Sequence, residues 1–83
     1  MRKKIRWTEE AKADVRRLDR QVAMQIFEAL DRYARTDEGD ITQLKGTQKE
    51  FKLRVGDWRV RFTRDEGNTM RIHHVLHRSE AYR

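Results

Sequence analysis

The stretch from Phe51 to Phe62 constrains the fold most, because apolar and basic residues alternate along it on both sides of a Gly-Asp pair. Side chains of a β-strand point to opposite faces in turn, so the alternation predicts two short strands joined by a two-residue turn at Gly56-Asp57. One face collects Phe51, Leu53, Val55, Trp58, Val60 and Phe62. The other face collects Lys52, Arg54, Arg59 and Arg61. The stretch therefore predicts a β-hairpin with an apolar face and a compact cationic face that attracts an anion.

The net charge of +6 is concentrated in the half of the chain that contains this hairpin. Residues 1–40 hold 10 Lys/Arg and 9 Asp/Glu, whereas residues 41–83 hold 10 Lys/Arg and 5 Asp/Glu. A basic excess carried by strand faces is typical of proteins that bind a polyanion. We favour this interpretation over a solvated basic surface kept for solubility.

A chain of 83 residues has room for one hydrophobic core, so we expect a single domain over residues 1–83. The absence of cysteine excludes a disulfide framework and a thiolate metal site. The apolar runs are too short for a membrane span, and no targeting segment is visible, which favours a cytoplasmic protein with no membrane partner.

Helical periodicity dominates the first half of the sequence. Thr8 is placed to cap a helix from Glu9 to Leu18, and Asp19 is placed to cap a second helix that runs to about Arg35. The second helix has the clearest apolar stripe, formed by Val22, Ile26, Ala29, Leu30 and Tyr33. Gly39, in the polar connector 36–40, is expected to end this helix.

Two further strands are expected, at Lys4–Trp7 and Met70–Leu76. The resulting order is β-α-α-β-β-β, which predicts an α+β fold with a helical hairpin packed on a small antiparallel sheet. Because neighbouring strand residues point to opposite faces, we expect His73 and His74 to be ordinary strand residues that cannot bind a metal jointly. His77 is balanced between a polar residue at a strand end and a catalytic residue.

With these segments in order, the chain resembles the RelE/ParE superfamily of toxin-antitoxin toxins, and the RelE branch more closely. The resemblance covers nearly the whole chain. It rests on the helical hairpin after a first strand, on Leu44-Lys45-Gly46, on the basic hairpin and on the ending Val75-Leu76-His77-Arg78-Ser79-Glu80-Ala81-Tyr82-Arg83. It implies a RelE-like fold and a bacterial toxin that cuts mRNA in the ribosomal A site, with a cognate antitoxin as protein partner and with no metal or small-molecule cofactor.

The resemblance also implies a site made of the basic hairpin and the chain end. Metal-free RNA cleavage by the ribose 2′-OH needs a base, an acid and cations around the developing negative charge. We expect Arg59 to stabilise the transition state, with Arg54 and Arg78 assisting. Lys52 anchors the phosphate and is a candidate base, because neighbouring cations favour its neutral form, and His77 competes for that role. Tyr82 is expected to stack on a base or donate a proton, and the remaining RNA contacts are assigned to Lys45, Lys49 and Arg61.

The identity of the general base and the class of function remain open from the sequence. Some relatives use a Glu and His pair for proton transfer, but Glu50 alone does not supply a convincing carboxylate here, so the general base is undecided. The ParE branch shares the fold but poisons DNA gyrase, and a plain RNA-binding module without catalysis would carry the same cationic face. The ParE branch generally lacks the basic catalytic set and the Arg-to-Tyr ending found in this chain.

Overall fold

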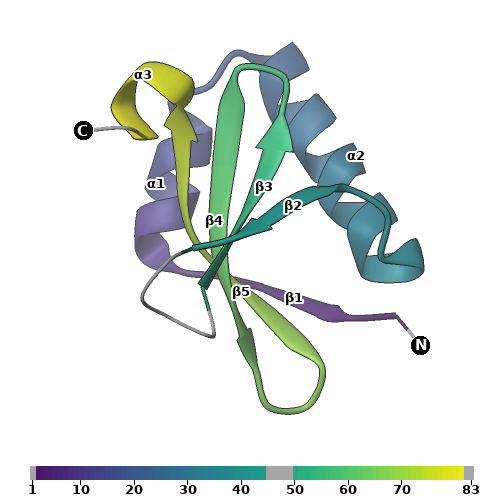
Figure 1. The fold of residues 1–83 in the computed structure, drawn as a ribbon. Helices are drawn as coiled ribbons and strands as arrows, with labels where there is room; N and C mark the ends of the chain where they lie inside the picture. Colours follow the sequence, from purple (N-terminus) through teal and green to yellow (C-terminus); the bar gives the residue numbers. More distant parts are fainter. Residues whose placement is uncertain (1, 45–49, 82–83) are drawn as a thin grey trace.

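The computed structural model describes residues 2–44 and 50–81 and confirms the predicted α+β class (Figure 1). The elements are β1 (Lys4–Trp7), α1 (Glu9–Arg16), α2 (Arg20–Thr36), β2 (Asp40–Gln43), β3 (Glu50–Val55), β4 (Trp58–Asp65), β5 (Thr69–His77) and α3 (Arg78–Ala81). The order β-α-α-β-β-β is present, and the structure adds strand β2 and the short helix α3 to it. None of the helices in the described ranges is long and apolar enough to cross a membrane.

The helix starts are those that the sequence predicts. The backbone N–H of Ala11 donates to Thr8 Oγ1 at 3.2 Å, and the N–H of Gln21 donates to Asp19 Oδ2 at 3.2 Å, so both side chains satisfy free donors of a first turn. The end of α2 differs, because Asp37 and not Gly39 adopts the left-handed conformation that ends the helix (φ 62°). Gly39 lies close to the core instead: a Cβ there would lie 3.0 Å from Leu53 Cδ1, so the Leu53 side chain would have to shift slightly.

The five strands form one sheet in the order β1-β5-β4-β3-β2. Three of the four pairings are antiparallel, and β1 runs parallel to β5. In the hairpin of β3 and β4, Val55 lies opposite Trp58, which leaves Gly56 (φ 59°) and Asp57 as the two-residue turn. The predicted register of the hairpin is therefore the observed one.

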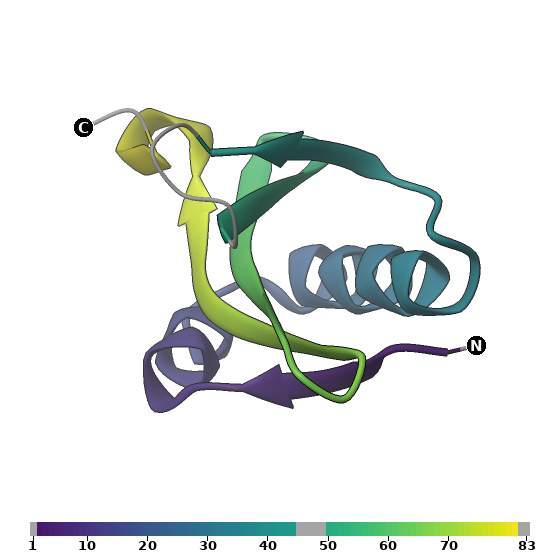
Figure 2. The same cartoon turned by 60° about the horizontal axis from the view of Figure 1, so that its bottom comes forward.

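The core lies between α2 and the sheet face that carries Leu53, Val60 and Phe62 (Figure 2). Ile26, Leu30 and Tyr33 of α2 are buried there, while residues 50, 52 and 54 of β3 and residues 59, 61 and 63 of β4 point the other way. We call this second side, away from α2, the front face of the sheet.

Helix α1 covers the part of the β5 edge that β1 is too short to pair. Val75 donates its N–H to Asp14 Oδ2 at 2.9 Å, and Thr8 donates its N–H to the carbonyl of Ile72 at 3.1 Å. The Asp14 carboxylate also pairs with Arg17 at 2.7 Å, which compensates for the burial of a residue that is only 8% exposed. An unpaired sheet edge is thus closed without another strand.

We expect Leu30→Ala to lower the free energy of unfolding by about 2–5 kcal/mol, because Leu30 is 1% exposed and its loss leaves a cavity under the sheet. The matched control is Met24→Ala on the same helix, where the side chain is 51% exposed and the expected change is within about 0.5 kcal/mol. Urea denaturation of both variants measures the difference. Equal losses would mean that α2 does not pack on the sheet as described.

Candidate nucleic-acid interface

The four hairpin cations lie together on the front face, as the alternation predicts. Lys52 is directly opposite Arg61 and Arg54 is directly opposite Arg59, so each cross-strand pair joins two groups of like charge. We call these four residues the cationic cluster. Like charges placed directly opposite each other destabilise a sheet, by roughly 0.2–1 kcal/mol for a pair. An anion bound between the strands would relieve this repulsion.

Few acidic groups on the front face can neutralise the cluster. Asp40 of β2 lies opposite Arg54, but no ion pair forms between them at hydrogen-bonding distance. Across residues 2–44 and 50–81, the side chains of Arg54 and Arg61 make no hydrogen bond and no ion pair. These two guanidinium groups are therefore available to phosphate oxygens, for which their planar donor geometry is suited.

Arg59 is placed differently from the other three members of the cluster. It is only 5% exposed, and its Nη1 donates to the carbonyl of Gly56 at 2.9 Å and to the carbonyl of Trp58 at 3.0 Å. In this conformation Arg59 stabilises the hairpin turn, whereas Arg54 presents its side chain to solvent. Its predicted role at the transition state stays a prediction.

His77 does not join the cationic cluster. Its register partner is Trp58, and the two rings meet edge to face with centroids 5.2 Å apart. Because Trp58 lies on the side of the sheet that carries Val60, His77 points away from the front face. Its Nδ1 accepts the backbone N–H of Ser79 at 3.3 Å, so the imidazole caps the start of α3.

Arg78 begins α3 beside the hairpin turn. Its N–H donates to the carbonyl of Asp57 at 2.8 Å, and its Nε lies 4.0 Å from Asp57 Oδ1. The start of α3 is therefore tied to the same turn that Arg59 stabilises.

Three predicted site residues, Lys45, Lys49 and Tyr82, lie outside the described residues.

A β-bulge changes the position of the two adjacent histidines. Arg61 pairs with His74 but Phe62 pairs with Ile72, so His73 is an extra residue on β5. Ile72 and Val75 are both buried in the core, and the two histidines between them lie on the front face. The expectation that they point to opposite faces is wrong. The apolar residues at 72 and 75 break the period of two, which is the signal that sequence reasoning missed.

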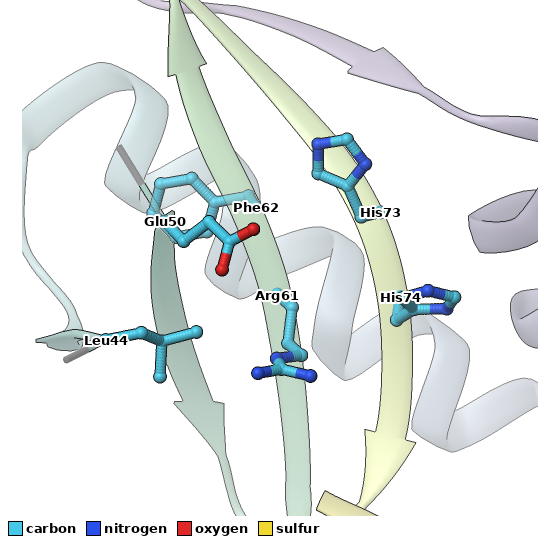
Figure 3. A pocket seen from close by; sticks show the side chains of 6 residues that line it. All are labelled: Leu44, Glu50, Arg61, Phe62, His73 and His74. Atoms are coloured by element: carbon cyan, nitrogen blue, oxygen red, sulfur yellow. The ribbon is translucent and has the colours of Figure 1, made fainter. Parts of the chain in front are cut away.

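The bulge contributes to a pocket of about 290 Å³ next to the cationic cluster (Figure 3). It is lined by Leu44, Glu50, Arg61, Phe62, His73 and His74. His74 is turned away from Arg61, and its Nδ1 lies 3.5 Å from Asp14 Oδ2 on α1. Within the described ranges, no group of three or more His, Asp or Glu residues is arranged to hold a metal ion.

We expect Arg61→Glu to raise the free energy of unfolding by roughly 0.2–1 kcal/mol, because it replaces a like-charge pair with Lys52 by an opposite-charge pair. The control Arg32→Glu alters an exposed cation of α2, which lies outside the cationic cluster, with an expected change within about 0.5 kcal/mol. Urea titrations at low and high salt measure both, and a destabilised Arg61→Glu variant would argue against repulsion in the free protein.

Comparisons with known proteins agree with this architecture. The sequence profile of a family described as "ParE toxin of type II toxin-antitoxin system, parDE" matches residues 5–82. No curated protein sequence is significantly similar to the chain.

Solved toxin structures have the same fold. The RelB-RelE antitoxin-toxin complex of Methanococcus jannaschii superposes with a TM-score of 0.77 at 20% identity, covering 93% of this chain and 94% of that one. The RelBE2 complex of Mycobacterium tuberculosis gives 0.76 at 22% identity, covering 93% and 99%. A mutant of the E. coli toxin RelE in the free state gives 0.78 at 21% identity, covering 99% and 92%. The chain therefore belongs to the ParE toxin family of type II toxin-antitoxin systems, within the RelE/ParE superfamily, and has a RelE-like fold.

Proposed function

We propose that this toxin is a metal-independent endoribonuclease that cuts mRNA in the ribosomal A site and so inhibits translation. The observation that carries the proposal is the placement of two like-charged residue pairs opposite each other on the front face, where Arg54 and Arg61 have no acidic partner among the described residues. A cluster of this kind suits a phosphodiester, whose negative charge increases in the transition state.

In the proposed reaction the ribose 2′-oxygen loses its proton and attacks the adjacent phosphorus, while the bond from phosphorus to the 5′-oxygen breaks. The products are a 2′,3′-cyclic phosphate and a 5′-OH, which takes up one proton. Lys52 lies on the front face and His77 does not, so Lys52 is the better placed of the two candidate proton acceptors. Arg54 stabilises charge on the non-bridging oxygens, and Arg61 contacts the RNA beside them.

We also propose an acidic antitoxin segment as the protein partner. The similar structures from M. jannaschii and M. tuberculosis are complexes of a toxin with an antitoxin. An acidic segment that covers the cationic cluster would compete with RNA for the same guanidinium and ammonium groups. Binding of the partner and inhibition of the toxin would then be one event.

Primer extension on ribosome-bound mRNA tests the nuclease. We expect the wild-type protein to cut the message, and Lys52→Ala and Arg54→Ala each to lower the cleavage rate by about 10²–10³-fold, the usual cost of losing one group that stabilises the transition state. Arg32→Ala, which removes an exposed cation from α2, should cut at the wild-type rate. An intact message with the wild-type protein would refute the nuclease proposal.

A gyrase supercoiling assay with the same preparations separates the alternatives. Loss of supercoiling with an intact message would support the ParE-like activity that the description of the family profile raises. RNA binding with neither activity, and with no toxicity in a growth test, would support a non-catalytic RNA-binding module.

A further inference from the structure

His74 and Asp14 make a contact at the edge of the front face where α1 meets β5. His74 Nδ1 lies 3.5 Å from Asp14 Oδ2, and the two groups form an ion pair when the imidazole is protonated. Asp14 is only 8% exposed, whereas the His74 side chain is 46% exposed. Within residues 2–44 and 50–81, Nε2 of His74 makes no hydrogen bond. One nitrogen of the ring therefore faces a carboxylate, and the other has no partner in the described chain.

The Asp14 carboxylate is itself fixed at both oxygens. Oδ1 accepts from Arg17 Nη2 at 2.7 Å, and Oδ2 accepts the backbone N–H of Val75 at 2.9 Å. These bonds hold the carboxylate in place beside the imidazole. A carboxylate against one nitrogen of an imidazole orients the ring and stabilises its positive charge, which prepares the other nitrogen for proton transfer.

His74 lies in one row with two members of the cationic cluster. Arg61 of β4 is the register partner of both Lys52 on β3 and His74 on β5. Because neighbouring strands are about 4.8 Å apart, Lys52 and His74 lie about 10 Å from each other, with Arg61 between them. Arg61 and His74 line the same hollow in Figure 3. A phosphate held at Arg61 therefore has Lys52 on one side and His74 on the other.

The adjacent histidine lacks this arrangement. His73 Nε2 lies 2.9 Å from Thr63 Oγ1, so this nitrogen is occupied by a hydrogen bond within the sheet. No carboxylate in the described part of the chain forms an ion pair with the His73 ring. Of the two front-face histidines, His74 is the one with an acidic partner and an unoccupied nitrogen.

We propose that His74 is the general acid of the cleavage reaction and that Asp14 is its positioning residue. The proposal rests on the proposed function, in which the leaving 5′-oxygen needs a proton. The attacking and leaving oxygens lie in line on opposite sides of phosphorus, so the base and the acid are needed on opposite sides, as Lys52 and His74 are.

The proton balance of this step is simple. The 5′-oxygen takes the electron pair of the broken bond to phosphorus and the proton of His74 Nε2–H, which gives the 5′-OH. The imidazole is left neutral, with its Nδ1–H toward Asp14, and regains a proton from water after the products leave. Lys52 takes the proton of the 2′-OH.

A sulfur atom in place of the bridging 5′-oxygen tests the acid, because a thiolate leaves without protonation. Ribosome-bound mRNAs carry either atom at the linkage that the wild-type protein cuts. We expect His74→Ala to cut the oxygen message about 10²–10⁴-fold more slowly than the wild type, the usual effect of losing a general acid, and the sulfur message at nearly the wild-type rate. Lys52→Ala, which lacks the base, should be slow on both messages. The matched control His73→Gln should cut both at nearly the wild-type rate.

The outcomes separate the acid from the nuclease. An equal loss on the two messages in His74→Ala, or no loss on the oxygen message, would overturn the proposal while the nuclease stands. Selective recovery with sulfur in Tyr82→Phe but not in His74→Ala would also overturn it. A wild-type protein that cuts neither message would refute the nuclease and the acid together.

Asp14→Asn tests the positioning residue, because it removes the charge and keeps an oxygen that can accept the N–H of Val75. We expect a smaller loss on the oxygen message than in His74→Ala, with recovery on the sulfur message. A purely structural role would lower the cleavage of both messages alike. Because the His74 side chain is half exposed, His74→Ala is expected to fold even if Asp14→Asn does not, and it decides the acid on its own.

Discussion

The structure depends on the direct pairing of β3 with β4 across the Gly56-Asp57 turn. This register buries Leu53 against Val60 and Phe51 against Phe62 on the side of α2, and it necessarily brings Lys52 opposite Arg61 on the front face. Burial of one large apolar side chain contributes about 1.5–3 kcal/mol, whereas a like-charge pair costs roughly 0.2–1 kcal/mol. The core therefore determines the register, and the placement of like-charged residues opposite each other on the front face is a consequence of it.

The elements outside the hairpin complete the site in distinct ways. β2 adds Leu44 at its end and Asp40 opposite Arg54, while α1 closes the edge of β5 through Asp14. The bulge in β5 brings His73 to the front face, where it forms the wall of a pocket beside the cations. The front face thus combines the guanidinium groups of Arg54 and Arg61 with a pocket beside them.

His77 caps the start of α3 and lies on the side of the sheet away from the cationic cluster, so its predicted role in proton transfer stays a prediction. Its ring meets Trp58 edge to face, across the sheet from the cationic cluster, and its Nδ1 accepts an N–H of the first turn of α3. Arg78, by contrast, begins α3 at the hairpin turn, within 4.0 Å of Asp57. The two neighbouring residues therefore make separate contacts: His77 caps the first turn of α3, and Arg78 lies beside the hairpin turn.

The sequence by itself determined the two helices with their caps, the hairpin, its turn and the gathering of four cations on one face. These features repeat with a local period or depend on adjacent residues, so they can be read without knowledge of distant contacts. Only the tertiary structure decided that His73 and His74 share a face, that His77 lies across the sheet and that Arg59 is bound to the turn. The positions of the three histidines depend on how β5 pairs with β4 and on where the register between these strands shifts. Such pairings join residues that are far apart in the chain.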